Sequence, residues 1–255
     1  MARSTVPFLM YHNILSEGDP YTITKEMFRE QIALLNENKY NVIAVRDFVS
    51  QQKTFEKQTK KNVCLTFDDG YSNNFTYCLP ELEKYNFKAT FYVTTSLINS
   101  DAGFTEDKIR TLSEKGMEIG SHTVNHVFLS NLIDDKLYYE LEESKKQLED
   151  IIQKPVTSLS LPGGRGNKRI FAAAQKAGYN TLCTSEYHPN DANTYLYSLG
   201  RIPIKRDYTI EQFEKIVSLD PVLWKSMKFK QDLKFIIQRI LGNKLYHSIW
   251  KMKYE

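Results

Sequence analysis

Apolar residues follow two different periods along the first 220 residues of the chain. Short runs rich in β-branched and aromatic residues, such as Asn62–Phe67, predict buried strands. Longer segments whose apolar residues recur three or four positions apart, as Leu137, Leu141 and Leu148 do, predict amphipathic helices. The predicted strands are 6–11, 41–45, 62–67, 88–93, 117–120, 157–161, 181–184 and 199–204, and the predicted helices are 24–36, 46–52, 72–86, 105–115, 134–153, 168–177 and 211–218.

Strands and helices alternate, which is typical of parallel strands joined by crossover helices. The seven or eight strand candidates suit a closed barrel as well as an open sheet. In both architectures, binding and catalytic residues gather at the carboxyl ends of the strands. Side chains that directly follow a strand are therefore the first candidates for chemistry.

The last 35 residues, 221–255, are predicted to form a basic amphipathic helical tail after a domain of residues 1–220. They hold eight basic and two acidic side chains, a net charge of +6, whereas residues 1–220 hold 26 basic and 29 acidic side chains, a net charge of −3. An apolar stripe at helical spacing comprises Phe229, Leu233, Ile236, Ile237, Ile240 and Leu241. Such a tail can lie on an anionic membrane. The commoner use of the pattern is to pack the stripe on the domain and leave the lysines in water.

Composition excludes several classes of protein. The 255 residues are 41% apolar and 25% charged, which is typical of a folded chain and not of a disordered one. A net charge of +3 is too small to indicate a nucleic-acid binder. No run is apolar enough to predict a membrane-spanning helix, and the apolar stretch 6–11 is too short for the core of a signal peptide. We therefore expect a cytoplasmic protein, with peripheral contact at the inner face of the membrane if the tail binds lipid.

Three cysteines, Cys64, Cys78 and Cys183, lie far apart in apolar segments. An odd number without close pairs argues against a disulfide framework and against a zinc ribbon. We expect all three to be buried thiols.

Two adjacent carboxylates, Asp68 and Asp69, follow the predicted strand 62–67 and precede Gly70. Carboxylates at the end of a buried strand are unfavourable unless a positive charge faces them, and a divalent metal ion supplies one. Because successive side chains of a strand point to opposite sides, both carboxylates reach one site only if the chain bends, which Gly70 permits. The alternative is an acidic turn that caps the next helix.

A pair of histidines, His122 and His126, follows the short predicted strand 117–120. If the loop turns helically, the two side chains share one face and can bind one metal ion. Taken alone, the pair fits two solvated loop histidines equally well. Together with the acidic pair, however, one carboxylate and two imidazoles form a ligand set that leaves a position open for water, which is typical of a catalytic metal site. The second carboxylate is then free to act as a base.

Thr66–Gly70 and His122–His126 resemble the TFDDG and H-[ST]-x-x-H motifs of the polysaccharide deacetylase family, the NodB-homology carbohydrate esterases. The order and spacing of the two motifs fit, and the resemblance covers residues 7–218 or so. The first strand ends in Tyr11 and His12, as it does in bacterial members that serve exopolysaccharide or cell-envelope glycan synthesis. The resemblance implies an α/β fold, a distorted (β/α)7 barrel of the TIM-like kind.

The resemblance also implies a role for each matching residue. Asp68 is expected to be the general base, and Asp69, His122 and His126 are expected to bind one divalent metal ion. The backbone N–H of Tyr71 is expected to help bind the oxyanion. Zinc is the expected ion, with cobalt or nickel as alternatives, since this ligand set accepts all three.

Three departures from the family pattern concern catalysis. Ser160 stands where the third motif usually has an arginine that holds the base, and Arg165, just downstream, is a candidate to reach back in its place. Pro162 and Gly163 still suit a rigid wall of the substrate groove. The Asp-x-x-Asp-Trp of the fourth motif is missing. Leu199-Gly200-Arg201 replaces the Leu-x-His of the fifth motif, whose histidine serves as the general acid.

Two histidines are candidates to replace the missing proton donor. His12 ends the first predicted strand, at the catalytic rim of a barrel, and His188 lies in the loop 185–193 after another strand. We favour His12, since a strand end is held more firmly than a long loop. The alternative for His12 is a strand-end histidine hydrogen-bonded to the backbone, and the alternative for His188 is an exposed loop residue.

These residues predict a metal-dependent hydrolase that removes N-acetyl groups from an amino sugar of a bacterial cell-surface or exopolysaccharide glycan, or of its lipid-linked precursor. The metal ion would polarise the acetyl carbonyl and acidify a water molecule, Asp68 would accept the proton of that water, and His12 would protonate the leaving amine. One alternative is a hydrolase of another amide or a formamide. A second is a catalytically silent saccharide-binding homologue, which the missing Leu-x-His favours and the intact Asp68 disfavours.

Overall fold

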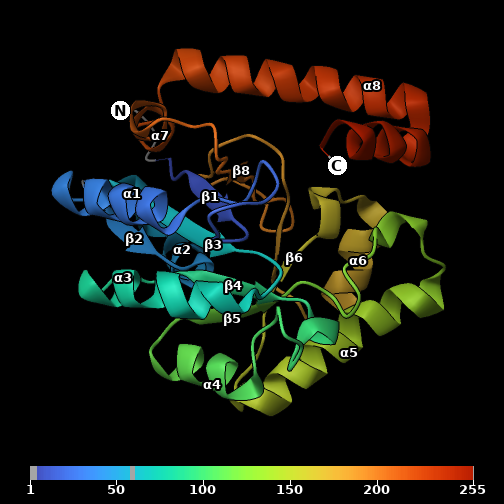
Figure 1. The fold of residues 1–255 in the computed structure, drawn as a ribbon. Coiled ribbons are helices and arrows are strands. Elements are labelled where there is room, and N and C mark those ends of the chain that lie inside the picture. Colours follow the sequence, from blue (N-terminus) through green and yellow to red (C-terminus); the bar gives the residue numbers. More distant parts are fainter. Residues whose placement is uncertain (1–4, 58–60, 255) are drawn as a thin grey trace.

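A parallel β-sheet forms the centre of the molecule (Figure 1). The computed structural model describes residues 5–57 and 61–254, and within them the side chains outside 55–57 and 238–254. The strands are β1 (Phe8–Tyr11), β2 (Asn41–Ile43), β3 (Asn62–Phe67), β4 (Thr90–Val93), β5 (Glu118–Ser121), β6 (Ser158–Ser160), β7 (Thr181–Cys183) and β8 (Ile202–Pro203). Each of them overlaps a strand that the apolar pattern predicts.

The strands pair in the order β7-β6-β5-β4-β3-β1-β8, and β2 pairs with β3 beside this path. All of the pairs between these strands are parallel. An isolated bridge between Cys183 of β7 and Leu199, just before β8, brings the two ends of the path together. The curled sheet is that of a distorted (β/α)7 barrel, which confirms the predicted fold class. In the register of β1 and β3, Tyr11 lies opposite Phe67, so the residues that follow both strands emerge at the same edge.

Helices cover the outside of the sheet (Figure 1). They are α1 (Lys25–Glu37), α2 (Val45–Gln51), α3 (Leu79–Lys84), α4 (Glu106–Glu114), α5 (Asp134–Ile152), α6 (Lys168–Lys176) and α7 (Ile210–Val217), with a π-helical turn, η2 (Asn74–Cys78), directly before α3. The last helix, α8 (Pro221–Tyr254), follows α7 and lies apart from the sheet (Figure 1). Several begin where a side-chain oxygen accepts a free backbone N–H of the first turn, as at Thr24, Thr105, Asn167 and Thr209. These caps explain why the predicted starts of the helices agree closely with the observed ones.

Aromatic rings pack against the ends of β1 and β3. Phe67 stacks between Tyr11 and Phe91, with ring centroids 5.3 and 4.7 Å away. Phe28 of α1 meets both Tyr11 and Phe67 edge-on. The Tyr11 hydroxyl donates a hydrogen bond of 2.9 Å to the side chain of Gln31, so its buried polar end is satisfied. This packing holds the strand ends from which His12 and Asp68 emerge.

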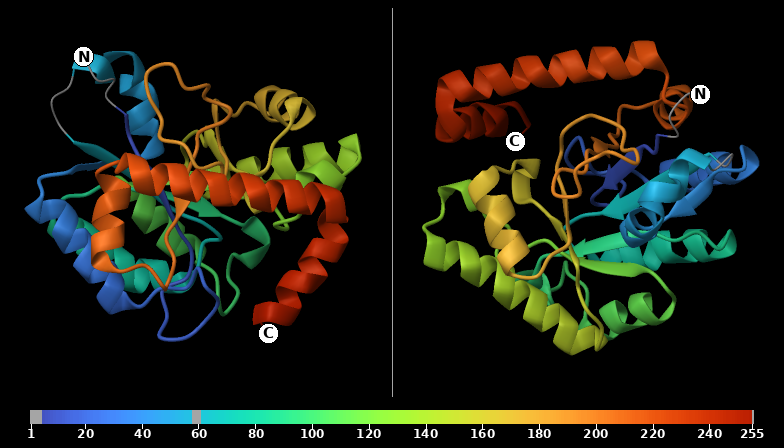
Figure 2. Two further views of the ribbon diagram at one scale, coloured as in Figure 1. Left: turned by 90° about the horizontal axis from the view of Figure 1, so that it is seen from above. Right: turned by 180° about the vertical axis from the view of Figure 1, so that it is seen from behind.

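The helix α8 begins at Pro221 and crosses the molecule in the view from above (Figure 2, left). Its side chains Trp224, Met227 and Gln231 are buried. The described members of the apolar stripe are exposed instead, namely Phe229, Leu233, Ile236 and Ile237. The interpretation that this stripe packs on the domain is therefore wrong for these residues, and Ile240 and Leu241 lie outside the described side chains. Within the described residues, no helix combines the length and the apolar character needed to cross a membrane.

The three cysteines, Cys64, Cys78 and Cys183, are buried and free, which confirms the prediction. Burial raises the pKa of each thiol, so each one stays protonated. Their buried thiols pack as small apolar side chains.

The aromatic stack generates a prediction about stability. Phe91→Ala is expected to lower the free energy of unfolding by about 3–5 kcal/mol, because truncating a buried ring removes apolar contacts and leaves a cavity. Urea denaturation followed by circular dichroism measures the change. Tyr139→Ala on α5, where the ring is exposed, is the control and should change the free energy of unfolding by less than about 0.5 kcal/mol. Equal effects of the two substitutions would contradict the importance of the stack.

Candidate metal centre and active site

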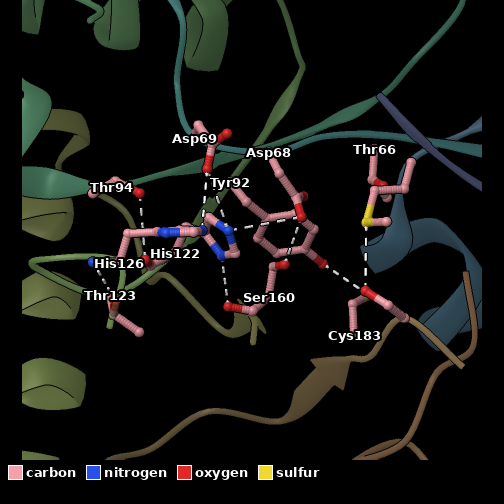
Figure 3. Close-up of polar contacts among 12 residues, drawn as sticks. Thr66, Asp68, Asp69, Tyr92, Thr94, His122, Thr123, His126, Ser160 and Cys183 are labelled. Carbon is pink, nitrogen blue, oxygen red and sulfur yellow. Dashed lines mark hydrogen bonds and ion pairs between the residues drawn. The ribbon is translucent and has the colours of Figure 1, made fainter. Parts of the chain in front are cut away.

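Asp68 and Asp69 lie where β3 ends and the chain bends. The backbone N–H of Asp68 still donates a hydrogen bond of 2.9 Å to the carbonyl of Tyr11 on β1. Asp69 and Gly70 then adopt left-handed φ angles of 74° and 81°. The bend brings both carboxylates toward His122 (Figure 3). A left-handed φ is unfavourable for an aspartate, and such strain is typical of a position where a site requires it.

A turn, and not a helix, brings the two histidines together. Thr123 and His126 have left-handed φ angles of 68° and 53°. The backbone N–H of His126 donates a hydrogen bond of 3.2 Å to the hydroxyl of Thr123. The helical turn that would have placed both histidines on one face is therefore not formed, yet the rings of His122 and His126 still meet, with centroids 4.7 Å apart.

The buried carboxylate of Glu140, on α5, holds this turn. Its Oε2 accepts hydrogen bonds of 2.9 Å from the backbone N–H groups of Val124 and Asn125, and its Oε1 accepts one of 2.7 Å from the Asn125 side chain. Three donors on one carboxylate fix the segment between the two histidines. The sequence analysis does not single out Glu140. A signal for it exists, because Glu140 lies three positions after Leu137 on the apolar side of its helix.

Three potential ligand atoms converge beside this turn. Oδ1 of Asp69 lies 3.5 Å from Nε2 of His122 and 3.4 Å from Nε2 of His126. A ligand atom of each of the three residues lies within 4.8 Å of the other two. Ligand atoms about 2.1 Å from a tetrahedral zinc ion lie roughly 3.4 Å from one another. The structure therefore brings together the three residues expected to bind the metal ion, with spacings that suit one.

The protonation of His122 supports the same conclusion. Its Nδ1 lies 2.8 Å from the carbonyl oxygen of Ser160, which only accepts, so Nδ1 carries the hydrogen. Burial lowers the pKa of His122, although Asp68 and Asp69 oppose the shift, so the ring is neutral and Nε2 has a lone pair. That lone pair faces carboxylate oxygens of Asp69 at 3.5 Å and Asp68 at 3.8 Å. Hydrogen-bond acceptors that face one another in a buried site repel each other unless a cation lies between them. The residues of this site therefore fit a metal ion.

Arg201 forms a two-pronged ion pair with Asp68. Its two terminal nitrogens lie 2.7 Å from Oδ1 and 2.8 Å from Oδ2 of the carboxylate, and both side chains are buried. The guanidinium also donates to the hydroxyls of Thr66 and Ser160 and to the carbonyl of Thr184. Every N–H of the fork therefore points at an acceptor, which is the geometry in which a buried ion pair is stable.

The pair sets the ionisation of both groups. Burial alone would raise the pKa of Asp68, but the Arg201 guanidinium, helped by His122 and His12, holds it well below its usual range. Burial would lower the pKa of Arg201, and the Asp68 carboxylate raises it instead. Asp68 is therefore a carboxylate, and Arg201 a guanidinium, at neutral pH.

Backbone contacts hold Arg201 in place just before β8. The N–H of Arg201 donates to the carbonyl of Glu186 at 3.0 Å. The side chain of Asn190 bonds both the N–H and the carbonyl of Gly200 at 2.9 Å. A Cβ at Gly200 would lie 2.5 Å from the carbonyl oxygen of His188, so only glycine permits this close approach.

Comparisons with known proteins identify the family. A family model described as polysaccharide deacetylase matches residues 55–182. YxkH of Bacillus subtilis (strain 168) is 31% identical over 199 residues, which cover 78% of this chain and 71% of that protein. The chain belongs to the polysaccharide deacetylase family.

Two further relatives of this family member have informative names. The peptidoglycan-N-acetylglucosamine deacetylase of Bacillus cereus is 32% identical over 127 residues, which cover 49% of this chain and 57% of that enzyme. The Streptococcus pyogenes deacetylase PplD, solved in complex with acetate, superposes with a TM-score of 0.78 at 26% identity, and the match covers 85% of this chain and 99% of that one. The chain thus spans little more than half of the peptidoglycan enzyme and nearly all of PplD.

In this family member, Arg201 and not Arg165 holds Asp68. The expectation that Arg165 reaches back is therefore wrong: its guanidinium lies over the ring of Phe235 on α8, 4.8 Å from the centroid. The short side chain of Ser160 leaves room for the Arg201 fork and adds a hydrogen bond of 3.0 Å to Asp68 Oδ2. The sequence alone shows Arg201 only as a departure from the fifth motif.

A cavity of about 630 Å³ opens beside His126, between the rim of the barrel and α8. Pro162, Gly163 and Arg165, all expected to serve the substrate, line it. The barrel adds Phe128 and Tyr208, and α8 contributes Leu223, Met227, Lys230, Gln231, Lys234 and Phe235. The apolar pattern of residues 221–255 does not indicate that this helix forms a wall of the cavity.

The two candidate proton donors, His12 and His188, differ in their surroundings. His12 follows β1 close enough to Asp68 to help lower the pKa of that carboxyl, and its Nδ1 is buried with no hydrogen-bond partner among the described residues. Nδ1 of His188 lies 3.3 Å from the carbonyl of Pro189, in its loop.

Tyr71 lies next to the acidic pair, in an isolated bridge with Gly103. The hydrogen bonds of that bridge come from the N–H groups of Ser72 and Phe104, so the N–H of Tyr71 takes no part in it. Burial, with Asp69 nearby, raises the pKa of the Tyr71 hydroxyl.

The ion pair generates a prediction. Arg201→Met is expected to lower the free energy of unfolding by about 3–5 kcal/mol, because it leaves the Asp68 carboxylate buried without its cation. The double variant Asp68→Asn/Arg201→Met should recover part of this loss in urea denaturation, since it leaves no buried charge. Arg169→Met, which breaks the exposed pair with Asp134, is the control and should cost about 1 kcal/mol or less. A single Arg201 variant as stable as the control would show that the pair is dispensable.

Proposed function

We propose that this chain is a metal-dependent hydrolase that removes N-acetyl groups from an amino sugar of a bacterial cell-surface glycan. The observation that supports this most strongly is the juxtaposition of a three-ligand set with a second carboxylate: Asp68 Oδ2 lies 3.8 Å from Nε2 of His122, which is itself 3.5 Å from Asp69. In a polysaccharide deacetylase family member, this combination suits hydrolysis of an amide by activated water.

Asp69, His122 and His126 would hold the metal ion, and zinc suits a tetrahedral set of one carboxylate and two imidazoles. Such an ion supplies Lewis acidity at the acetyl carbonyl and lowers the pKa of a water molecule, so that even a weakly basic carboxylate can accept its proton. His126 is 48% exposed, whereas His122 is almost fully buried, so the open side of the site lies toward His126 and the cavity.

Asp68 is the proposed general base. Its low pKa keeps it ionised, and the Arg201 fork holds it in one orientation beside the ligand atoms. Oδ2 also accepts from Ser160, so rotation of the carboxylate would break hydrogen bonds to two residues. A base that is positioned in advance loses little entropy when the reaction begins.

His12 is the proposed proton donor for the leaving amine. It emerges at the same edge as Asp68, because Tyr11 and Phe67 are paired in the sheet register. Its Nδ1, buried without a partner among the described residues, is an unsatisfied group of the kind that a catalytic role explains. The backbone N–H of Tyr71 would donate a hydrogen bond to the oxyanion. A donor of this kind typically stabilises the transition state by about 3 kcal/mol.

The cavity suits a saccharide in size and lining. Aromatic side chains of Phe128, Tyr208 and Phe235 can stack on sugar rings, while Pro162 and Gly163 line the same cavity as His126. The names of the relatives that act on peptidoglycan support a glycan of the cell envelope as the substrate. A catalytically silent binding protein is the second candidate, which the replacement of Leu-x-His by Leu199-Gly200-Arg201 favours.

The division of roles between the carboxylates generates a prediction. Asp68→Asn is expected to keep about one metal ion per chain and to lower kcat by roughly 10²–10⁴-fold, because it removes the base but no ligand. His126→Ala is expected to lose the metal ion together with activity. Mass spectrometry of protein purified without chelators measures the metal, and acetate release from an N-acetylglucosamine oligomer measures the activity.

His188→Ala is the matched control for His126→Ala and should keep its metal ion. If Asp68→Asn is unstable because Arg201 is left unpaired, Asp68→Asn/Arg201→Met serves in its place. Equal loss of metal in the Asp68 and His126 variants would overturn the division of roles. A native chain that binds metal but releases no acetate from any N-acetylated saccharide would support the silent binding protein instead.

The assignment of the proton donor generates a further prediction. His12→Gln is expected to lower kcat by about 10²-fold or more with little change in KM or metal content, because it removes a proton donor and no ligand. His188→Gln is the control and should retain near-normal kcat. Steady-state acetate release at saturating substrate measures both variants, and the opposite ranking would transfer the role to His188.

A further inference from the structure

The outward face of α8 is apolar and exposed. Phe229 is 70% exposed, Leu233 50% and Ile236 56%, and Val222 and Ile237 are exposed as well. These positions follow one another at intervals of seven, four, three and one, which places them on a single face of a helix. The described part of α8 therefore presents a continuous apolar strip to its surroundings.

The opposite face of α8 already has its partners. Trp224 donates its indole N–H to the carbonyl of Ile216 at 3.0 Å, and Gln231 accepts from the N–H of Tyr187 and donates to the carbonyl of Ser185. The inward face of α8 therefore already packs on the barrel, and the apolar strip is a second, separate face of the helix. A soluble chain rarely leaves so many large apolar side chains in one exposed strip unless the strip binds something.

Charge indicates what this strip binds. Lys225 and Lys230 are exposed on the two flanks of the strip, while Lys228 is paired with Asp232. The segment 221–255 carries eight basic and two acidic side chains, whereas residues 1–220 carry a net charge of −3. A helix with an apolar face between lysine-rich flanks is typical of segments that lie in the interface of an anionic bilayer. A second copy of this chain would instead bring two such positive faces together.

We propose that the outward face of α8 docks the protein on an anionic lipid surface, with Phe229, Leu233 and Ile236 inserted among the lipids. The lysines on both flanks then meet the negative headgroups. This inference does not depend on the proposed function, because vesicle binding requires neither a metal ion nor catalysis.

Docking through α8 has a consequence for the candidate active site. The inward side of the same helix, through Met227, Gln231 and Phe235, forms a wall of the cavity beside His126. A bilayer on one side of α8 therefore lies a helix width, about 10 Å, from the cavity on the other side. If the proposed function holds, this geometry favours a saccharide that is itself attached to a lipid.

Co-sedimentation of the full-length protein with vesicles tests the proposal. Vesicles of phosphatidylglycerol and phosphatidylcholine should retain the native chain, and pure phosphatidylcholine vesicles should retain much less. Phe229→Ser/Leu233→Ser should weaken binding to the anionic vesicles roughly tenfold or more, because two apolar anchors are lost. Lys225→Gln/Lys230→Gln should also weaken it, and salt should weaken the binding of the native chain.

Matched variants on α5 control for general effects. Tyr139→Ser removes an aromatic residue that is 55% exposed, and Lys136→Gln/Lys146→Gln removes two exposed lysines, so both variants should bind vesicles like the native chain. Equal binding of native protein and the Phe229/Leu233 variant, or no binding by either, would overturn the proposal. So would light scattering that shows a native dimer and a monomeric Phe229/Leu233 variant, which would assign the strip to a second copy.

Discussion

The buried ion pair between Asp68 and Arg201 is the constraint on which the rest of the site depends. A carboxylate at the end of a buried strand would be protonated or displaced without a cation, because burial raises its pKa. The Arg201 fork prevents both, and it does so through two parallel hydrogen bonds that fix the orientation of the carboxylate as well as its charge. With Asp68 held in this way, the adjacent Asp69 is free to turn through the left-handed bend toward the histidines.

The two adjacent aspartates, Asp68 and Asp69, therefore have different environments. The Asp68 carboxylate accepts hydrogen bonds from a guanidinium and a hydroxyl, whereas Oδ1 of Asp69 lies 3.5 Å from Nε2 of His122 and 3.4 Å from Nε2 of His126, an arrangement that suits a metal ion. Glu140 is a second buried carboxylate that is held by hydrogen bonds. It fixes the loop between the histidines because it accepts hydrogen bonds from two backbone N–H groups of that loop. Arg201 for the acidic motif and Glu140 for the histidine motif are separate anchors that together position the site.

The helix α8 links this site to the surroundings of the protein. Its inward side closes the cavity beside His126, and its outward side is an apolar strip between lysines. One amphipathic helix can have both functions because its two sides lie back to back along the same stretch of helix, residues 222–237. The proposed lipid contact and the proposed substrate cavity are therefore geometrically coupled, although the apolar anchors Phe229, Leu233 and Ile236 are not among the residues that line the cavity.

The sequence by itself determined the order of strands and helices, the caps that start the helices, and the acidic and histidine motifs, because these depend on neighbours a few positions away. The meeting of Asp69 with His122 could be foreseen only because both follow strands of one parallel sheet. The tertiary structure alone decided that Arg201, 133 positions from Asp68, and not Arg165 supplies the cation. It also decided which face of α8 stays exposed. Helical periodicity gives the faces of a helix but not their partners, and a contact over such a separation depends on how the whole barrel packs.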